Sequence, residues 1–136
     1  MAWPLARRGA AAQALVETAL IFPLFVALSL GLLQVALYAH ARDVLLGAAQ
    51  EGVRLAAEDG RSLDDGLERV NDLTRAGLGS TVEPLRTQAH RDAEVVEITI
   101  DTRLSPVLPL PLRDGLPVHV RATMTRERFR PYGGRL

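Results

Sequence analysis

The pattern of apolar and polar residues divides the chain into one long apolar segment and a remainder with short-period alternation. Residues 18–39 (TALIFPLFVALSLGLLQVALYA) carry no formal charge. A helix needs about 20 mostly apolar residues to cross the hydrocarbon core of a bilayer. The segment therefore predicts a membrane-spanning helix, and the sequence contains no second segment of this kind.

The same helix is expected to continue beyond the span, because residues 40–58 contain no Pro and are rich in Ala and Leu. Their apolar and small positions repeat at steps of three and four, which places them on one helical face. These positions are Ala41, Leu45, Ala48, Gly52 and Ala56. The ladder Ala48, Gly52 and Ala56 allows another backbone to approach closely. Either the chain's own domain or a partner helix can pack against this face of the helix.

A second, amphipathic helix is predicted over residues 63–76. The pair Asp59-Gly60 indicates a turn before it, and Ser62 is suited to cap its first turn. Its apolar stripe is Leu63, Leu67, Val70, Leu73 and Leu78. Its charged residues, expected to face solvent, are Asp64, Glu68, Arg69, Asp72 and Arg75. Gly77 and Gly79 are expected to close the helix.

Alternation with a period of two predicts β-strands in the last third of the chain. One strand covers residues 94–103, and a second covers 118–128 and should pair with it antiparallel. A third strand is expected within 85–90. The side chains expected to point inward are Val96, Ile98, Ile100, Val118, Val120, Ala122 and Met124.

Residues 104–117 are expected to form a connecting loop. Four prolines make a regular interior strand or helix unfavourable there. They are Pro106, Pro109, Pro111 and Pro117. The elements together predict an α+β fold, with a long N-terminal transmembrane helix that continues into a small domain of one short helix and a small antiparallel sheet.

The charges that flank the apolar segment predict its orientation. Arg7 and Arg8 precede it, whereas His40, Arg42 and Asp43 follow it and nearly balance. The positive-inside bias places the N-terminus in the cytoplasm and the rest of the chain outside. A cleaved secretory signal peptide is the alternative, but the apolar run exceeds the usual core of about 7–15 residues.

Composition excludes several classes of function. The formal net charge is zero, with 16 basic residues, all Arg, and 16 acidic ones, so no nucleic acid is expected as a partner. The absence of Cys excludes disulfides and thiolate sites. The three histidines (His40, His90 and His119) are far apart in the sequence. We expect no catalytic, metal or cofactor site, and no enzyme.

Two residues near the start of the span stand out. Glu17 directly precedes the uncharged run, where a carboxylate is costly unless it reaches water or finds a partner. An acid on the positive-inside flank is unfavourable for topology, which favours a cation from a neighbouring chain as its partner. Pro23 lies within the span, removes a helical hydrogen bond and predicts a kink.

These residues resemble a known family. Residues 7–17 (RRGAAAQALVE) followed by 18–24 (TALIFPL) resemble the N-terminus of TadE-like proteins, which are minor pilins or pseudopilins of the tight-adherence (Tad) branch of type IV pilus machinery. The segment 48–54 (AAQEGVR) is similar to the element that often follows the membrane in this family. The resemblance covers residues 7–58.

The resemblance implies that a prepilin peptidase removes the basic leader. A cut between Ala12 and Gln13 would make Glu17 the fifth residue of the mature chain, the familiar place of the pilin glutamate. Ala12 stands where the family usually has Gly, so a cut after Gly9 and an uncut chain remain alternatives. In a filament, Glu17 would pair with the new N-terminal amine of a neighbouring subunit and fix its register.

The expected organisation is a leader (1–12), a transmembrane and assembly helix (13–39), an extracytoplasmic domain (40–129) and a flexible tail (130–136). The resemblance implies a structural minor pilin that acts in pilus assembly for adhesion, secretion or DNA uptake. Its partners would be other Tad pilins, the prepilin peptidase, pilus platform proteins and the lipid bilayer. The alternative is an unprocessed single-pass accessory protein of an envelope or secretion complex.

Overall fold

The structure, a computed structural model, describes residues 4–82, 85–106 and 115–126, with the backbone alone for residues 4–12. It confirms the α+β fold predicted from the sequence. The elements are α1 (Pro4–Ala57), α2 (Leu63–Leu78), the short 3-10 helix η1 (Gly79–Thr81) and the strands β1 (Arg86–Arg91), β2 (Val95–Leu104) and β3 (Leu116–Thr125). The expected tail, residues 130–136, lies outside the described residues.

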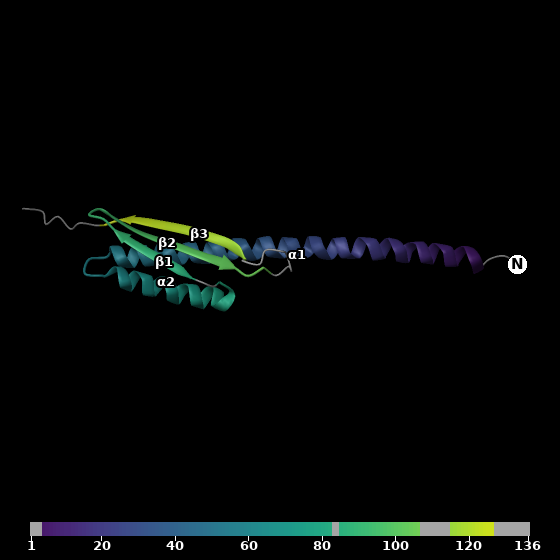
Figure 1. The fold of residues 1–136 in the computed structure, drawn as a ribbon, viewed down its shortest axis with the longest axis horizontal. Coiled ribbons are helices and arrows are strands. Elements are labelled where there is room, and N and C mark those ends of the chain that lie inside the picture. Colours follow the sequence, from purple (N-terminus) through teal and green to yellow (C-terminus); the bar gives the residue numbers. More distant parts are fainter. Residues whose placement is uncertain (1–3, 83–84, 107–114, 127–136) are drawn as a thin grey trace, which may run out of the picture.

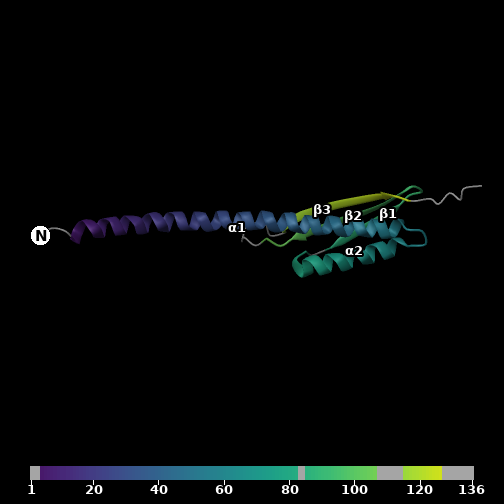
Figure 2. The same cartoon turned by 180° about the vertical axis from the view of Figure 1, so that it is seen from behind.

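The helix α1 is the axis on which the rest of the chain is built (Figure 1). Its N-terminal half extends away from the other elements, whereas its C-terminal half carries the whole domain. The helix α2 runs back along this half, and the sheet lies along another side of it, as the view from behind also shows (Figure 2). The molecule therefore has two parts, an uncovered helix and a domain wrapped around the continuation of that helix.

The turn between the helices forms as its sequence predicts. The Ser62 side chain accepts a hydrogen bond from the backbone N–H of Asp65, and the Asp65 carboxylate accepts one from the backbone N–H of Ser62. This reciprocal capping box satisfies two donors that the first turn of a helix leaves free. Gly79 ends α2 with a φ of 56°, a conformation that favours glycine.

The sheet is antiparallel in the order β1-β2-β3, so β2 is central and both of its neighbours are edge strands. Ile98 of β2 pairs with Ala89 of β1 and with Ala122 of β3. Alternate residues of β2 are buried, because one face of the sheet packs on the helices and the other meets solvent. All three predicted strands are present. β1 ends one residue beyond the expected 85–90, β2 is shifted by one residue from 94–103, and β3 begins two residues before the expected 118–128.

The core fills the space between the C-terminal half of α1, α2 and the inner face of the sheet. Its most deeply buried large side chains are Leu45, Val53, Val70, Val96, Ile98, Ile100 and Val118. All of the positions predicted on the inner face of α1, from Ala41 to Ala56, are buried. The extended helix is therefore a core element of the domain as well as a stalk.

Two residues of β3 differ from the expectation, one in burial and one in secondary structure. Met124 lies opposite the buried Val96, on the inward face as expected, but is 40% exposed. It lies near the end of an edge strand, where Val96 is its cross-strand neighbour on one side and no strand pairs on the other. Pro117 was placed in a loop but is the second residue of β3. An edge strand tolerates a proline, because the missing N–H can face away from the ladder.

The buried line of α2 also differs from the predicted stripe. The buried residues are Gly66, Val70, Thr74 and Leu78, whereas Leu63, Leu67 and Leu73 are only partly buried at the flanks. Gly66 on this line lets α2 approach α1 closely. The five charged residues expected to face solvent are all exposed.

Candidate functional site

The N-terminal half of α1 exposes a continuous apolar surface. From Gln13 to Ser29 every residue is exposed in the isolated chain, and Leu20 reaches 73%. Among the described residues, one helix, Gln13–Ala57, is long and apolar enough to cross a membrane. Isolated large apolar side chains on a surface are ordinary, but an uninterrupted apolar helix of this kind needs lipid or other apolar helices around it. Its largest exposed side chains are Leu15, Leu20, Ile21, Phe22, Leu24, Phe25 and Leu28.

Glu17 stands among these apolar side chains. It is exposed, with Val16 beside it and Leu20 one turn away, both largely exposed as well. No residue in the described part of the chain forms an ion pair with Glu17. The described residues therefore supply the carboxylate but no cation that balances its charge.

The predicted processing site lies on the same helix. The backbone of α1 is continuous through Ala12 and Gln13, and Gln13 is exposed. The side chain of Ala12 is outside the described residues. Glu17 follows Gln13 by about one helical turn, so an amine created at Gln13 would lie near the carboxylate of its own chain or of a neighbour.

Pro23 lies inside α1, and the helix continues on both sides of it. A proline has no N–H, so the carbonyl of Ala19, four residues earlier, loses its usual helical donor. Membrane helices tolerate such a position when a neighbouring helix or side chain bonds the carbonyl. The predicted kink remains a prediction.

The small residues in the C-terminal half of α1 lie against α2. A Cβ placed on Gly52 would collide with the side chain of Val70 and the backbone of Gly66, and one placed on Gly66 would lie 2.9 Å from Ala56 Cβ. Ala48 is buried as well. Of the two occupants left open by the sequence, the chain's own helix α2 packs against Gly52 and Ala56 of this ladder.

Gly66 was missed in the sequence, although a signal was present. A glycine inside a helix costs about 1 kcal/mol relative to alanine, so it indicates a close contact that needs the missing side chain. Gly77 shows the same relation, because a Cβ there would lie 2.6 Å from Val44 Cγ1. We call the contact of Val44, Gly52 and Ala56 with Gly66 and Gly77 the α1–α2 seam.

Arg91 is a second residue that sequence reasoning missed. Its Nη2 donates to the carbonyl oxygen of Ala56 at 2.5 Å and to that of Arg61 at 3.2 Å. The last carbonyls of a helix have no donor within the helix and attract positive charge. Arg91 therefore joins the end of β1 to the end of α1 and to the turn that follows.

Gln34 was also missed. It is 6% exposed, although most of its neighbours on α1 remain exposed. It is the one amide within the apolar run 18–39, which is the signal that could have identified it. Four residues later, Tyr38 Oη donates to the carbonyl oxygen of Pro117 at 3.3 Å. These two residues mark the level at which the domain begins to cover α1.

An exposed ion network follows on α1. The Arg54 guanidinium lies 2.9 Å from both Glu51 and Glu58. Its hydrogen bond lowers the pKa of the Glu51 carboxyl, and the same hydrogen bond raises the pKa of Arg54. Exposed pairs of this kind contribute little to stability, so we read the network as a solvated helix face.

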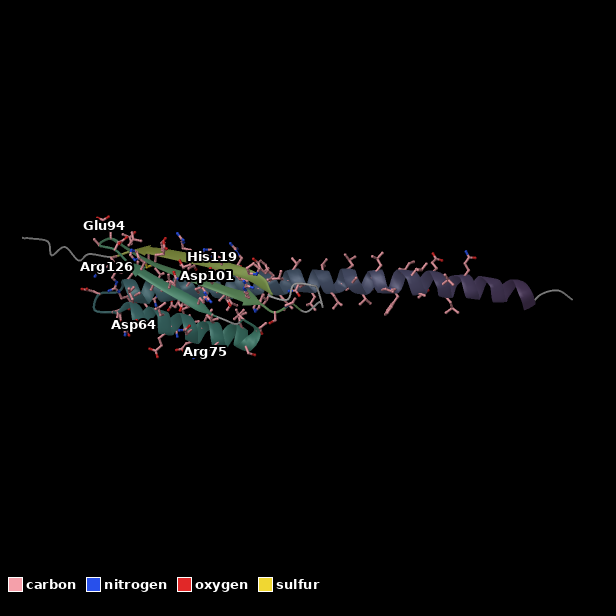
Figure 3. The ribbon with its side chains drawn as sticks, viewed as in Figure 1. Asp64, Arg75, Glu94, Asp101, His119 and Arg126 are labelled. Atoms are coloured by element: carbon pink, nitrogen blue, oxygen red, sulfur yellow. The ribbon has the colours of Figure 1, made fainter. Side chains whose placement is uncertain are left out.

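The histidines lie apart from one another. His119 Nδ1 is 2.6 Å from Asp101 Oδ1 on the outer face of the sheet (Figure 3), and His90 Nε2 is 3.0 Å from Asp92 Oδ1. His40 is exposed on α1. Within the described ranges no three His, Asp or Glu side chains gather as metal ligands do.

The comparison with protein families gives one match. The model of the family described as TadE-like protein matches residues 12–54. The match begins at the predicted cut, covers the uncovered half of α1 and ends within the half that carries the domain. It confirms the resemblance to the TadE-like family. No curated protein and no solved structure matches the chain.

Proposed function

We propose that this protein is a minor pilin or pseudopilin, because residues 12–54 match the TadE-like family and so associate the chain with the Tad pilus and its other components. In this role it is a structural subunit that acts in assembly of the pilus and carries no catalytic site. The observation that carries the proposal is the division of α1 into an uncovered apolar half and a half that forms the core of a domain.

The division of α1 into these two halves suits a subunit that moves from the membrane into a filament. The uncovered half can anchor the chain in the cytoplasmic membrane, with the N-terminus inside and the domain outside. The same apolar surface can then pack against the helices of other pilins, because neither state requires the domain to rearrange. The domain holds its half of α1 through the α1–α2 seam and the sheet, so the helix and domain move as one body.

In this proposal, Glu17 sets the axial register between neighbouring subunits. A prepilin peptidase would cut between Ala12 and Gln13, and the new amine of a neighbouring subunit would lie near Glu17 among apolar helices. A lone carboxylate there is costly, whereas a paired one is tolerated and selects one arrangement. That Glu17 has no partner among the described residues of its own chain supports an intermolecular one.

Fractionation of cells that make the pilus tests the proposal. Sheared surface filaments and washed membranes are separated, and the chain is detected in each with an antibody against its domain. We expect the chain in both fractions when the platform proteins are present, and in the membranes alone when they are deleted. A chain confined to the membranes in both strains would contradict the proposal and favour the unprocessed accessory protein.

A further inference from the structure

The boundary of the bilayer on α1 can be located from the way the domain covers the helix. Going along α1 from Gln13, where its side chains are first described, the first buried residue is Gln34. Burial then recurs at Ala41, Leu45 and Ala48, at the steps of three and four that mark one helical face. The domain-facing stripe thus begins inside the segment 18–39 that the sequence alone assigns to the membrane.

The contact at Tyr38 fixes the level of the sheet relative to this stripe. Tyr38 Oη donates to the carbonyl of Pro117, the second residue of the edge strand β3. Open sheet edges do not occur within the hydrocarbon, since their free backbone groups would be unsatisfied there. The hydrocarbon must therefore end before Tyr38, and the buried Gln34 one turn earlier marks the place.

Three described segments of the domain lie at this level. They are residues 79–82, 104–106 and 115–117, which we call the basal surface. These described residues carry no charge, whereas the connecting residues 83–84 and 107–114, outside the described part of the chain, include Glu83, Arg113 and Asp114. The opposite end is made by the α1–α2 turn and the β1–β2 turn, which carry Glu58, Asp59, Arg61, Asp92 and Glu94. Figure 3 shows Glu94 and Arg126 at this far end.

We infer that the hydrocarbon ends at Gln34 rather than at Ala39, and that the basal surface of the domain rests on the lipid headgroups. The partner is a bilayer surface. Exposed Ser80, Thr81 and Ser105 offer hydroxyl groups without the desolvation cost of a charge. Tyr38 has the ring that is enriched at this depth of a membrane. The inference rests on the membrane anchoring that the proposed function requires.

The boundary has a consequence for the other end of the span. Counting about 20 residues back from Gln34 places the inner boundary near Ala14. Glu17 then lies about 4.5 Å inside the hydrocarbon, at about 1.5 Å per residue. A span of 18–39 would instead leave Glu17 at the inner surface, in contact with water.

Spin labels on single cysteines test the boundary, since the natural chain has no cysteine. The full chain is labelled, reconstituted into vesicles of phosphatidylethanolamine and phosphatidylglycerol, and measured for collision with oxygen and with a water-soluble nickel chelate. The helix positions are Leu15, Leu24, Leu32, Val35 and Ala39, all exposed in the isolated chain. Ser105 on the basal surface and Glu94 at the far end form a matched pair.

We expect oxygen to dominate at Leu15, Leu24 and Leu32, nickel to dominate at Ala39, and the change to fall at Val35. The Ser105 label should show headgroup depth and the Glu94 label free exposure to nickel. A crossing about five residues later, at Ala39, with nickel dominant at Leu15, would overturn the inference and leave the proposed function standing. Nickel access at Leu24 would overturn both, because α1 would not lie in the bilayer.

Discussion

Gly52 of α1 and Gly66 of α2 lie against each other so closely that neither position has room for a side chain. A Cβ on Gly52 would lie 2.8 Å from the carbonyl oxygen of Gly66, and a Cβ on Gly66 would lie 2.7 Å from that of Gly52. Both obstacles are backbone atoms, so they cannot turn aside as a flexible side chain would. The seam between the two helices therefore requires glycine at both places.

The first prediction is that Gly52→Ala destabilises the domain although alanine is the better helix former. The added methyl group must separate the helices or displace Val70, and such overpacking costs about 1–3 kcal/mol. We expect a lower midpoint of thermal unfolding for the full chain in detergent, followed by circular dichroism.

Gly47→Ala is the matched control, because it lies on the same helix and a Cβ there has nothing within 4 Å. It should be neutral or gain up to about 1 kcal/mol from helix propensity. Equal midpoints for the two variants would show that the seam does not depend on close backbone approach.

A second prediction concerns the cap that Arg91 places on α1. Arg91→Gln removes the charged donor from the carbonyl groups of Ala56 and Arg61. Hydrogen bonds from charged groups contribute about 1.5–3 kcal/mol, and we expect a loss of stability within this range by urea unfolding. Arg121→Gln is the control, since Arg121 lies 3.6 Å from Glu97 in an exposed pair. Such pairs contribute little, and a loss as large as that of Arg91→Gln would count against the cap.

A third prediction follows from the capping box at Ser62. Ser62→Ala should cost about 1 kcal/mol, whereas Ser80→Ala, in the uncapped 3-10 helix, should leave the midpoint unchanged. The two substitutions are compared by urea unfolding of the full chain at neutral pH. A similar loss from both would indicate that the hydroxyl of Ser62 has no capping role.

The same box predicts a dependence on pH. The backbone N–H of Ser62 donates to the Asp65 carboxylate and holds its pKa below the ordinary value of 3.8. The folded chain thus binds this proton less tightly than the unfolded chain. The stabilisation is present above pH 3.8 and is lost as the pH falls through the lower pKa of the folded state. Asp65→Asn should therefore show a shallower loss of stability in acid than the natural chain does.

The strongest expectations from sequence rested on local patterns, namely the periodicity of the strands and the capping residue of α2. The strand around Val96, Ile98 and Ile100 and the cap at Ser62 depend on neighbours within a few residues, and the structure confirms them. The secondary structure of Pro117 and the exposure of Met124 could not be predicted in this way. Their environments depend on β3 being an edge strand, which the order of strands along the sequence does not fix.

The contacts that join the two helices and the sheet were harder to predict for a related reason. Arg91 lies 35 residues beyond the carbonyl group of Ala56 that it bonds, and one arginine among 16 basic residues gives no local signal of such a contact. Gln34 and Gly66 did give signals, as an amide in an apolar run and a glycine in a helix. Their partners appear only when the elements are assembled.

A fourth prediction concerns assembly. Glu17→Gln keeps the shape of the side chain and removes the charge, so a neighbouring amine loses its partner. We expect normal recovery of the variant from membranes and at least a tenfold loss from sheared filaments, which corresponds to about 1.4 kcal/mol. Asp43→Asn, an exposed acid on the same helix, should enter filaments normally. Equal recovery of both variants in filaments would remove the register role of Glu17.

The most direct test is the intact mass and N-terminal residue of the protein recovered from native membranes. We expect a chain that begins at Gln13, which gives Glu17 an amine to pair with in a neighbouring subunit. A chain that still carries Arg7 and Arg8 would contradict it, because the leader would then be a permanent part of a static membrane protein.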